Sequence, residues 1–278
     1  MRSEFCNFIL VFNALYMNKR TALITGATQG IGYYFSRIMA RNKVDLVLID
    51  KNEDHLLELA LDLYQRYGVR VKFIPFDMSK NNAPFVVYND IIKDGFHIDY
   101  LINNAGVGDG GYFHEIDWEK EREMINLNVV CLVQLTKLIL NDMVKLGKGR
   151  VLNVASTAAF QPGPNMAVYH ATKAFVLSFS EAIANELKNS GITVTALCPD
   201  PKQSGLQHLA EIEVNKLLKM RKLPKDWEVA EFGFHSMIEG KTVAVNGFMN
   251  RLLLNTMRLF RKSTPGHPYA KYPVSNNE

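Results

Sequence analysis

The chain lacks the features that mark several protein classes. It has only three cysteines, Cys6, Cys131 and Cys198, and they are scattered. Neither a disulfide framework nor metal-ligand spacing is present, so no metal site is expected. The formal net charge is +4, and no Lys/Arg run interleaved with aromatic residues indicates a nucleic-acid surface. No repeat, linker or low-complexity stretch divides the chain. These absences leave a globular protein, which we expect in the reducing environment of the cytoplasm.

Long hydrophobic runs are also missing. The apolar stretch at residues 5–17 falls short of the roughly 20 residues that a bilayer span needs. It also lacks the basic start and the cleavage site of a signal peptide. Residues 1–16 are open to three interpretations: a segment that packs on the domain, a tail that touches a membrane surface, and a dispensable extension. We favour the dispensable extension, because the sequence from Met17 reads as a natural start of the domain.

What the chain does have is an alternation of short apolar strands and helix patterns, in a composition that is 47% hydrophobic. Strands are predicted at residues 21–25, 44–50, 69–75, 100–103, 150–155 and 192–197. Helices are predicted at residues 31–41, 52–67, 84–93, 118–146 and 167–189, with Asn52 or Asp54 capping the second. The strands are apolar on both faces, which indicates a parallel sheet covered by helices on both sides. We therefore expect one α/β domain over residues 17–262 and a tail at residues 263–278.

The pattern loosens after the sixth predicted strand. Further helices are predicted at residues 204–220 and 229–237, and a last strand at residues 242–245. Residues 203–240 are expected to form a lid that is rich in Leu, Met and Phe, which hints at a lipophilic ligand. Residues 250–262 have the pattern of a basic amphipathic helix, for which packing on the domain or on a partner subunit is favoured over contact with a membrane surface.

Three glycines, Gly26, Gly30 and Gly32, come directly after the first strand and open the first helix. Glycines there allow a tight turn and let backbone N–H groups approach a pyrophosphate, which the N-terminus of the helix also attracts. A Gly-rich match alone is often a simple turn, but here it occupies the strand–turn–helix context that dinucleotide binding requires. The predicted cofactor site also includes the turn residues Thr28, Gln29 and Ile31.

Other candidate cofactor contacts follow the next strands. Asp50 ends the second strand about 20 residues beyond the glycines, where a carboxylate hydrogen-bonds the adenosine ribose and repels a 2′-phosphate. Lys51 follows at once, and a cation there would instead hold a 2′-phosphate. We favour NAD over NADP because of Asp50. The remaining candidates are Asp77 and Met78 after the third strand, where Asp77 can meet the adenine edge, and Asn104, Ala105 and Gly106 after the fourth.

The strongest chemical signal is the pair Tyr169 and Lys173, with Ser156 thirteen residues before the tyrosine. A free tyrosine has a pKa of about 10 and is a poor base near neutrality. Lys173 lies one helical turn on, and its positive charge lowers the pKa of the phenol. Tyr169 can then give a proton to a carbonyl oxygen or take one from an alcohol, while the Ser156 hydroxyl holds the same oxygen. Each residue alone is ordinary, but their joint spacing argues against coincidence.

These motifs resemble the short-chain dehydrogenase/reductase family, most strongly over residues 18–200. The resemblance implies a single Rossmann-type, doubly wound domain of about seven strands, a nicotinamide cofactor that is NAD or NADP, and assembly into dimers or tetramers. It also implies that Lys173 binds the nicotinamide ribose. The backbone of Asn128 is expected to help hold a water for proton relay, with Asn126 as a competitor for that role.

The turn after the sixth predicted strand departs from the family pattern. Family members usually have Pro-Gly here, and a Thr near the nicotinamide amide a few residues later. This chain has Pro199-Asp200-Pro201 followed by Ser204. Asp tolerates unusual backbone angles, so the turn can survive. Pro199 therefore stays in the predicted cofactor site, and the hydroxyl of Ser204 can replace that of the Thr.

Together the residues predict an oxidoreductase that interconverts a carbonyl and a secondary alcohol by hydride transfer, with Tyr169 as the acid and base. The chain most resembles family members that reduce fatty-acyl or steroid-like ketones, while sugar alcohols and small ketones stay open. One alternative is a catalytically idle dinucleotide sensor, against which the complete Ser/Tyr/Lys set argues. Another is a membrane-surface protein that uses both apolar ends of the chain. His170 is expected to point away from the chemistry.

The helices predicted at residues 128–146 and 167–187 carry more apolar surface than one face needs. The residues in question are Val129, Val130, Leu132, Val133, Leu135 and Leu138 on the first, and Phe175, Val176, Phe179 and Ile183 on the second. A helix that is apolar all round is buried on all sides. We therefore expect a homodimer or homotetramer, in which a partner subunit covers the side that the sheet does not. The alternative is that the C-terminal segment covers it.

Overall fold

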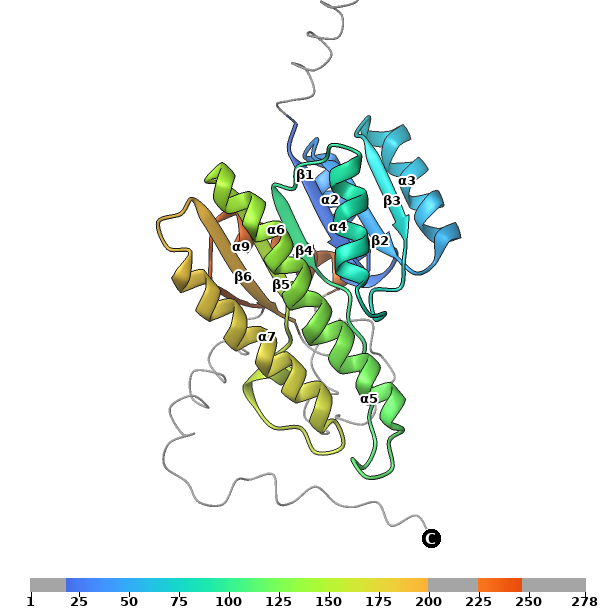
Figure 1. The fold of residues 1–278 in the computed structure, drawn as a ribbon, viewed down its shortest axis with the longest axis vertical. Coiled ribbons are helices and arrows are strands. Elements are labelled where there is room, and N and C mark those ends of the chain that lie inside the picture. The colour runs from blue at the N-terminus through green and yellow to red at the C-terminus, as the bar shows by residue number, and fades with distance from the viewer. Residues whose placement is uncertain (1–18, 200–224, 247–278) are drawn as a thin grey trace, which may run out of the picture.

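Seven parallel strands form one sheet in the computed structural model, which describes residues 19–199 and 225–246 (Figure 1). The strands are β1 (Thr21–Thr25), β2 (Asp45–Asp50), β3 (Val71–Pro75), β4 (Tyr100–Asn103), β5 (Gly149–Val154), β6 (Ile192–Cys198) and β7 (Val243–Val245). Their order is β3-β2-β1-β4-β5-β6-β7. This confirms the predicted Rossmann-type, doubly wound sheet. The strand order reverses between β1 and β4, which is where ligands bind in such sheets.

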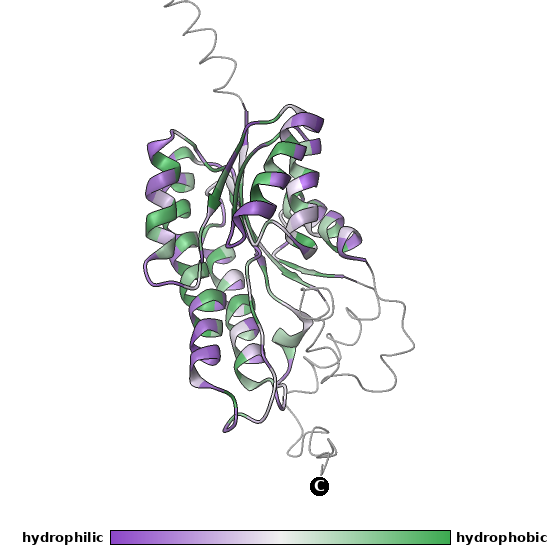
Figure 2. Ribbon diagram, turned by 90° about the vertical axis from the view of Figure 1, so that its right-hand side faces the viewer, coloured by the Kyte–Doolittle hydropathy of each residue, from purple (hydrophilic) through white to green (hydrophobic). Residues whose placement is uncertain are grey.

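Helices cover both faces of the sheet (Figure 1). One face carries α2 (Gly30–Arg41), α3 (Glu53–Tyr67) and α9 (Asp226–Ile238). The other carries α4 (Ala83–Lys93), α6 (Leu132–Leu146) and α7 (Ala167–Glu186). The helix α5 (Trp118–Ile125) leads into α6, and a short 3-10 helix, η2 (Thr157–Phe160), precedes α7. Figure 2 shows the alternation of hydrophobic and hydrophilic residues around these helices, as expected for helices with one face on a core.

The strands bury side chains on both faces, which is why they read as apolar runs. Leu23, Val47 and Leu101 pack in the cluster that contains residues of α4 and α6. Their neighbours along the strands, such as Ile24 and Leu48, pack in the cluster that contains residues of α2, α3 and α9. The period of two along each strand thus builds two cores, one on each side of the sheet.

The predicted helix boundaries hold to within a few residues, with two informative differences. Asn52, not Asp54, is the N-cap of α3, and its side chain accepts a hydrogen bond from the N–H of His55 at 3.0 Å. The helix α7 ends at Glu186 instead of Asn189. Asn189 has a φ of 76°, a left-handed conformation that a helix does not continue through.

The predicted helix at residues 118–146 is interrupted by a π-helical segment, η1 (Asn126–Cys131), between α5 and α6. Such segments are rare and occur most often at functional sites. The whole stretch is long and apolar enough to cross a membrane by composition, with a mean hydropathy of 1.5 in its most apolar window. However, Leu135, Ile139 and Met143 are buried in the core beneath the sheet. We therefore interpret it as a core helix.

Part of the expected lid belongs to the core. In the stretch at residues 203–240, α9 packs on α2 and on the sheet, and Val229 and Met237 are fully buried. The helix expected at residues 229–237 is thus present, but as a layer of the domain and not as a cover over a site. Residues 203–224 of the expected lid lie outside the described residues. So do the extension at residues 1–16, the helix at 204–220, the helix at 250–262, the tail at 263–278 and Ser204.

Candidate functional site

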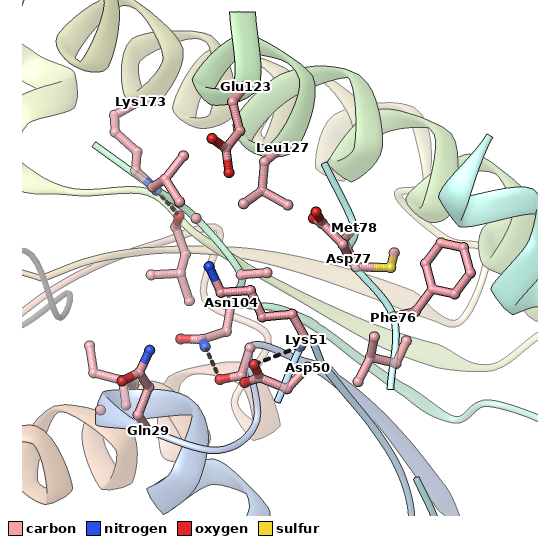
Figure 3. A pocket seen from close by; sticks show the side chains of 18 residues that line it. Gln29, Asp50, Lys51, Phe76, Asp77, Met78, Asn104, Glu123, Leu127 and Lys173 are labelled. Atoms are coloured by element: carbon pink, nitrogen blue, oxygen red, sulfur yellow. Dashed lines mark hydrogen bonds between the residues drawn. The ribbon is translucent and has the colours of Figure 1, made fainter. Parts of the chain in front are cut away.

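A cleft opens at the carboxyl ends of the strands, where the strand order reverses (Figure 3). Twelve of the predicted site residues line it: Gly26, Gln29, Gly30, Ile31, Asp50, Lys51, Asp77, Met78, Asn104, Ala105, Gly106 and Lys173. Six others do not form its wall: Thr28, Gly32, Asn128, Ser156, Tyr169 and Pro199. The cleft therefore unites residues from β1, β2, β3, β4 and α7, which lie far apart in the sequence.

The Gly-rich turn is shaped by close approaches that only glycine permits. Gly26 has a φ of 64°, and a Cβ there would lie 3.0 Å from the Cα of Ala105. A Cβ on Gly32 would lie 2.0 Å from the carbonyl oxygen of Gly26. Thus Gly32 acts by letting α2 pack against the turn and does not face the cleft. By contrast, a Cβ on Gly30 would meet nothing within 4 Å, so the cleft is open at the start of α2.

The N-terminus of α2 is left available to a ligand. Its N-cap residue, Gln29, makes no capping hydrogen bond with its side chain, and the first turn contains no acidic residue. The first N–H groups of a helix lack partners within the helix and carry a partial positive charge. An uncapped N-terminus that faces an open cleft is therefore suited to an anion such as a pyrophosphate.

Thr25 and Asn104 fasten the Gly-rich turn to the end of β4. The hydroxyl of Thr25 accepts the backbone N–H groups of Asn104 and Ala105, each at 3.0 Å. The side-chain amide of Asn104 donates to the carbonyl oxygens of Thr25 at 3.1 Å and Gly26 at 2.9 Å. These bonds hold the two sides of the cleft floor in one position. Thr25 was not among the predicted site residues, although its place directly before Gly26 was a signal in the sequence.

Asp50 is held in a fixed orientation by the Gly-rich turn. One carboxylate oxygen accepts the backbone N–H of Thr28 at 3.1 Å and the hydroxyl of Thr28 at 2.7 Å. The other accepts the backbone N–H of Lys51 at 2.8 Å. Thr28 therefore positions Asp50 instead of lining the cleft.

Asp77 lies at the end of the cleft next to β3. Its Oδ1 accepts both the backbone N–H of Ser79 at 3.0 Å and the hydroxyl of Ser79 at 2.7 Å. Partial burial raises the pKa of Asp77, but the hydrogen bonds from Ser79 and the nearby charges of Lys80 and Lys51 outweigh it. The pKa of Asp77 is consequently below its ordinary value, and the carboxylate stays charged.

Lys173 is buried beneath the cleft on α7, one turn after Tyr169. Its ammonium group donates to the carbonyl oxygen of Val154 at 3.0 Å and lies 5.8 Å from the centre of the Tyr169 ring. Burial lowers the pKa of Lys173 to about 8, because the charged form loses its hydration. Tyr169 is fully buried in a cluster with Ala158, two residues after Ser156. Tertiary packing thus brings η2 and α7 together, as the sequence motif requires.

Ser156 and Asn128 are both buried and both hold loops at the edge of the site. The hydroxyl of Ser156 accepts the backbone N–H of Ala158 at 3.1 Å and donates to the carbonyl oxygen of Pro199 at 3.4 Å. The side chain of Asn128, within η1, pairs with both backbone groups of Val107, at 3.0 and 2.8 Å. Asn128 is therefore the buried member of the two asparagines considered. Asn126 is only partly buried and lines a separate groove together with Asp77 and Lys80.

His170 points away from the cleft, as expected. Its Nδ1 lies 2.8 Å from the carbonyl oxygen of Gln161, and its ring packs so closely on Gly163 that a Cβ there would lie 2.2 Å from it. The loop before α7 is thus anchored to the helix that carries Tyr169. The next turn of this loop is joined to the loop after β4, because the N–H of Gly111 donates to the carbonyl oxygen of Asn165 at 2.8 Å.

Six residues of the cleft wall were not predicted from the sequence: Ile49, Phe76, Val107, Glu123, Leu127 and Val154. Most are the apolar neighbours of predicted residues at strand ends, so adjacency was the available signal. Leu127 of η1 directly precedes the predicted Asn128, so adjacency applies to it as well. Glu123 comes from α5, and no local motif in the sequence indicated it.

Comparison with known proteins gives the family. Residues 20–213 match the family model described as short chain dehydrogenase. This chain is a short-chain dehydrogenase/reductase. It is 33% identical over 230 residues to a very-long-chain 3-oxoacyl-CoA reductase of Rattus norvegicus, covering 81% of this chain and 68% of that protein. It is 30% identical to the ketoacyl reductase HetN of a Nostoc species, covering 71% of this chain and 69% of that protein.

Solved structures agree with this assignment. A short-chain dehydrogenase from Sphingobium yanoikuyae in complex with NADPH superposes with a TM-score of 0.74 at 27% identity, covering 91% of this chain and 100% of that chain. A bulky-bulky ketone specific alcohol dehydrogenase from Comamonas testosteroni has a TM-score of 0.74 at 26% identity, covering 90% and 97%. The short-chain dehydrogenase/reductase described here is thus an NAD(P)-dependent oxidoreductase.

The cleft of this short-chain dehydrogenase/reductase fits such a cofactor. The uncapped N-terminus of α2 offers N–H donors to a pyrophosphate. A Cβ on Gly106 would lie 3.1 Å from Oδ1 of Asn128 and 3.4 Å from the ammonium of Lys173, so glycine keeps the far end of the cleft open. Asp50 and Asp77 stand at the opposite end. The cleft therefore has an anion site in the middle and polar groups at both ends, which matches a dinucleotide.

Proposed function

We propose that this enzyme interconverts a carbonyl and a secondary alcohol, with Tyr169 as the proton donor and acceptor. The observation that carries this proposal is the buried ammonium of Lys173, held by Val154 and placed 5.8 Å from the Tyr169 ring. A cation fixed beside a buried phenol favours the phenolate and lowers the pKa of the phenol. The spacing of the two residues on α7 puts them on one face of the helix.

The chain's own residues then have separate tasks. The nicotinamide cofactor, when bound, supplies or accepts the hydride. Tyr169 moves the proton at the substrate oxygen, and the hydroxyl of Ser156 holds that oxygen. Lys173 stays largely protonated at neutral pH because its pKa of about 8 lies above 7. We also propose that Lys173 binds the nicotinamide ribose and that the backbone near Asn128 holds the relay water. The π-helical segment supports the second role, since it frees backbone carbonyl groups from α-helical bonding.

A lipophilic ketone is the proposed substrate. The names of the relatives support this, since they include very-long-chain 3-oxoacyl-CoA reductases and a ketoacyl reductase. The test is a carbonyl panel that compares 3-oxoacyl-CoA esters of increasing chain length with small ketones and sugars, followed through the loss of NADH or NADPH. We expect kcat/KM to rise with acyl chain length. Equal kcat/KM for short and long chains would contradict the lipophilic assignment.

We propose NAD as the preferred cofactor because Asp50 is fixed. Thr28 and the backbone of Lys51 prevent its carboxylate from turning away, so a 2′-phosphate at this position would meet a negative charge. Asp50→Ala is expected to weaken NADH binding by about tenfold, since a hydrogen bond to a charged group contributes about 1.5 kcal/mol or more. It should strengthen NADPH binding, and calorimetric titration of both cofactors measures each effect.

The matched control for Asp50→Ala is Asp54→Ala, which removes an exposed carboxylate from the first turn of α3, outside the cleft wall. The control should leave the ratio of the two dissociation constants unchanged. If the unmodified protein already binds NADPH about tenfold more tightly than NADH, a difference of about 1.4 kcal/mol, Lys51 sets the preference and the proposal is wrong.

We propose a homodimer or homotetramer, assembled through η1, α6 and α7. The exposed fractions of Val130 in η1 and Phe175 in α7 are 52% and 43%, while Cys131 and Val176 on the same two elements are buried. Exposed apolar side chains beside a buried core face indicate a surface that a second subunit covers.

Light scattering of the unmodified protein should give a particle mass that is a multiple of 31.5 kDa. Val130→Asp with Phe175→Asp should dissociate the assembly, whereas Leu61→Asp on α3 should not. A particle of 31.5 kDa for the unmodified protein would overturn the proposal.

The cytoplasmic location and the dispensability of residues 1–16 stay predictions. Deleting residues 1–16 and measuring solubility and activity separates a dispensable extension from a membrane-touching tail.

A further inference from the structure

Thr172 is a buried residue of α7 that lies between Tyr169 and Lys173 in the sequence. Its exposed fraction is 4%, and it does not line the cleft. Its hydroxyl donates to the carbonyl oxygen of Tyr169 at 2.8 Å, a bond within the helix that threonine commonly makes. The same hydroxyl accepts a hydrogen bond from the side-chain amide of Asn128 at 3.2 Å. This second bond crosses from η1 to α7, so Thr172 joins the turn that carries Tyr169 and Lys173 to another element.

Asn128 extends this connection to the loop after β4. Its side-chain nitrogen also donates to the carbonyl oxygen of Val107 at 2.8 Å, and its Oδ1 accepts the N–H of Val107 at 3.0 Å. The preceding residue is Gly106, where a Cβ would lie 3.1 Å from Oδ1 of Asn128 and 3.4 Å from the ammonium of Lys173. A chain of hydrogen bonds thus runs from the loop beside this ammonium, through η1 and Thr172, to α7.

The ammonium of Lys173 needs this support, because one hydrogen bond does not fix it. Among the described residues, it donates only to the carbonyl oxygen of Val154, at 3.0 Å. An ammonium group has three donors on a flexible stem, so a single bond leaves its orientation open. Its distance of 5.8 Å from the centre of the Tyr169 ring therefore depends on where the backbone of α7 stands. The effect of a charge on a phenol falls with distance, so this placement decides how strongly Lys173 acts.

We propose that Thr172 is a positioning residue: its hydroxyl fastens the turn from Tyr169 to Lys173 onto η1, and this keeps the ammonium at the distance at which it stabilises the phenolate. Thr172 lies outside the cleft wall, so it acts through Lys173 and not on the substrate or the cofactor. Loss of the hydroxyl would leave the amide of Asn128 beside an apolar group and let α7 shift against η1. The proposal rests on the proposed function, since it takes Tyr169 as the proton donor and acceptor.

Other titratable groups stand around the pair, and a change of one hydroxyl alters none of them. The ring of His170 is centred 6.0 Å from that of Tyr169. Cys198, at the end of β6, acts electrostatically on the ammonium. From α5, Glu121 is buried and Glu123 lines the cleft. A variant that loses only the hydroxyl therefore shifts the ionisation of Tyr169 through the placement of the pair, and not through a gained or lost charge.

The test measures the ionisation of Tyr169 in Thr172→Val, which keeps the shape of the side chain and removes its hydroxyl. The ultraviolet absorbance of tyrosinate is titrated in the full chain, and the curve of the matching Tyr169→Phe protein is subtracted. We expect the pKa of Tyr169 to rise by about one unit, because the phenolate loses part of the stabilisation that the nearby ammonium gives it. Oxidation of a long-chain 3-hydroxyacyl-CoA ester by NAD should shift its pH profile upward by the same amount, and kcat below that pKa should fall about tenfold.

Ser180→Ala is the matched control, on the same helix about two turns beyond Thr172. The buried hydroxyl of Ser180 donates to the carbonyl oxygen of Val176 at 2.7 Å and accepts the side-chain amide of Asn153 at 2.9 Å. The control thus loses the same two kinds of hydrogen bond and should lower Tm comparably, while the pKa of Tyr169 stays unchanged. Thr172→Ser keeps the hydroxyl and should restore both the pKa and kcat. Thr172→Ala carries the same expectation as Thr172→Val and replaces it if the valine variant does not fold.

Three results would overturn the proposal. The first is an unchanged pKa of Tyr169 in Thr172→Val. The second is an equal shift in Ser180→Ala, which would trace the effect to a loosened helix. The third is a shift in Thr172→Ser as large as that in Thr172→Val, since the hydroxyl would then be irrelevant. If Tyr169 of the unmodified protein ionises no lower than the ordinary value of about 10, the proposed function fails first. A lowered pKa that does not respond to Thr172 contradicts this proposal alone.

Discussion

Tyr169→Phe is expected to lower kcat by about 10²-fold or more while the dissociation constant of NADH stays within about twofold of its original value. The substitution removes one oxygen, the proposed proton donor, from a fully buried side chain and keeps the ring that packs with Met124, Ala158 and Met166. Stability should change little, since the shape of the cluster is retained. Steady-state kinetics with a ketone substrate and calorimetry with NADH measure the two effects separately.

The matched control for Tyr169→Phe is Tyr88→Phe. Tyr88 lies on α4 outside the cleft wall, and its hydroxyl donates to the carboxylate of Asp142 at 2.6 Å. This hydrogen bond raises the pKa of Tyr88 to about 12, so the phenol stays protonated in the working range of the enzyme. The control loses a phenolic oxygen without losing activity. A Tyr169→Phe protein with a kcat close to that of the unmodified enzyme would remove Tyr169 from the mechanism.

Gly32→Ala is expected to have the second largest effect, on cofactor binding. A Cβ at this position would lie 2.0 Å from the carbonyl oxygen of Gly26 and 2.5 Å from the side-chain nitrogen of Asn104. The first contact is with backbone, so the turn itself must shift away from α2. Overpacking of this kind costs about 1–3 kcal/mol, and a shifted turn carries its pyrophosphate donors out of place. We expect NADH to bind about ten- to 100-fold more weakly, at about 1.4 kcal/mol for each factor of ten.

The control for Gly32→Ala is Gly68→Ala, which tests whether lost stability alone weakens binding. Gly68 caps the C-terminus of α3 with a φ of 64°, and a Cβ there would meet nothing within 4 Å. Alanine in this left-handed conformation costs about 1 kcal/mol of stability and should lower Tm without changing the affinity for NADH. Calorimetric titration and thermal unfolding of both variants make the comparison. Equal NADH affinity in Gly32→Ala and the unmodified protein would show that the turn is not the pyrophosphate site.

The sheet was predictable because each strand corresponds to a short apolar run in the sequence that ends at a turn residue. The run of five residues at β1 is apolar on both faces and stops at Gly26, and the structure places the strand at the same residues. The start of α3 was predictable to within two residues, since Asn52 and Asp54 were both candidate caps, and the structure shows that Asn52 is the cap. The interruption at η1 was not predictable, because its six residues include neither Pro nor Gly and continue the pattern of an ordinary helix. Asn128 is turned toward Val107 by contacts that exist only after folding.

The features of the site also fall into two groups, those that the sequence predicted and those that only the tertiary structure decided. The sequence alone determined the fold, the Gly-rich turn and the pairing of Tyr169 with Lys173, because helix and strand periodicity and turn chemistry act over a few residues. Tertiary structure alone decided that Thr28 holds Asp50, that α9 belongs to the core, and that Glu123 of α5 lines the cleft. These features depend on which distant segments meet and on what remains of each side chain's hydrogen-bonding capacity. A local sequence pattern predicts neither the meeting of distant segments nor the hydrogen bonds that a side chain makes with them, because burial and pairing are determined only when the whole chain packs.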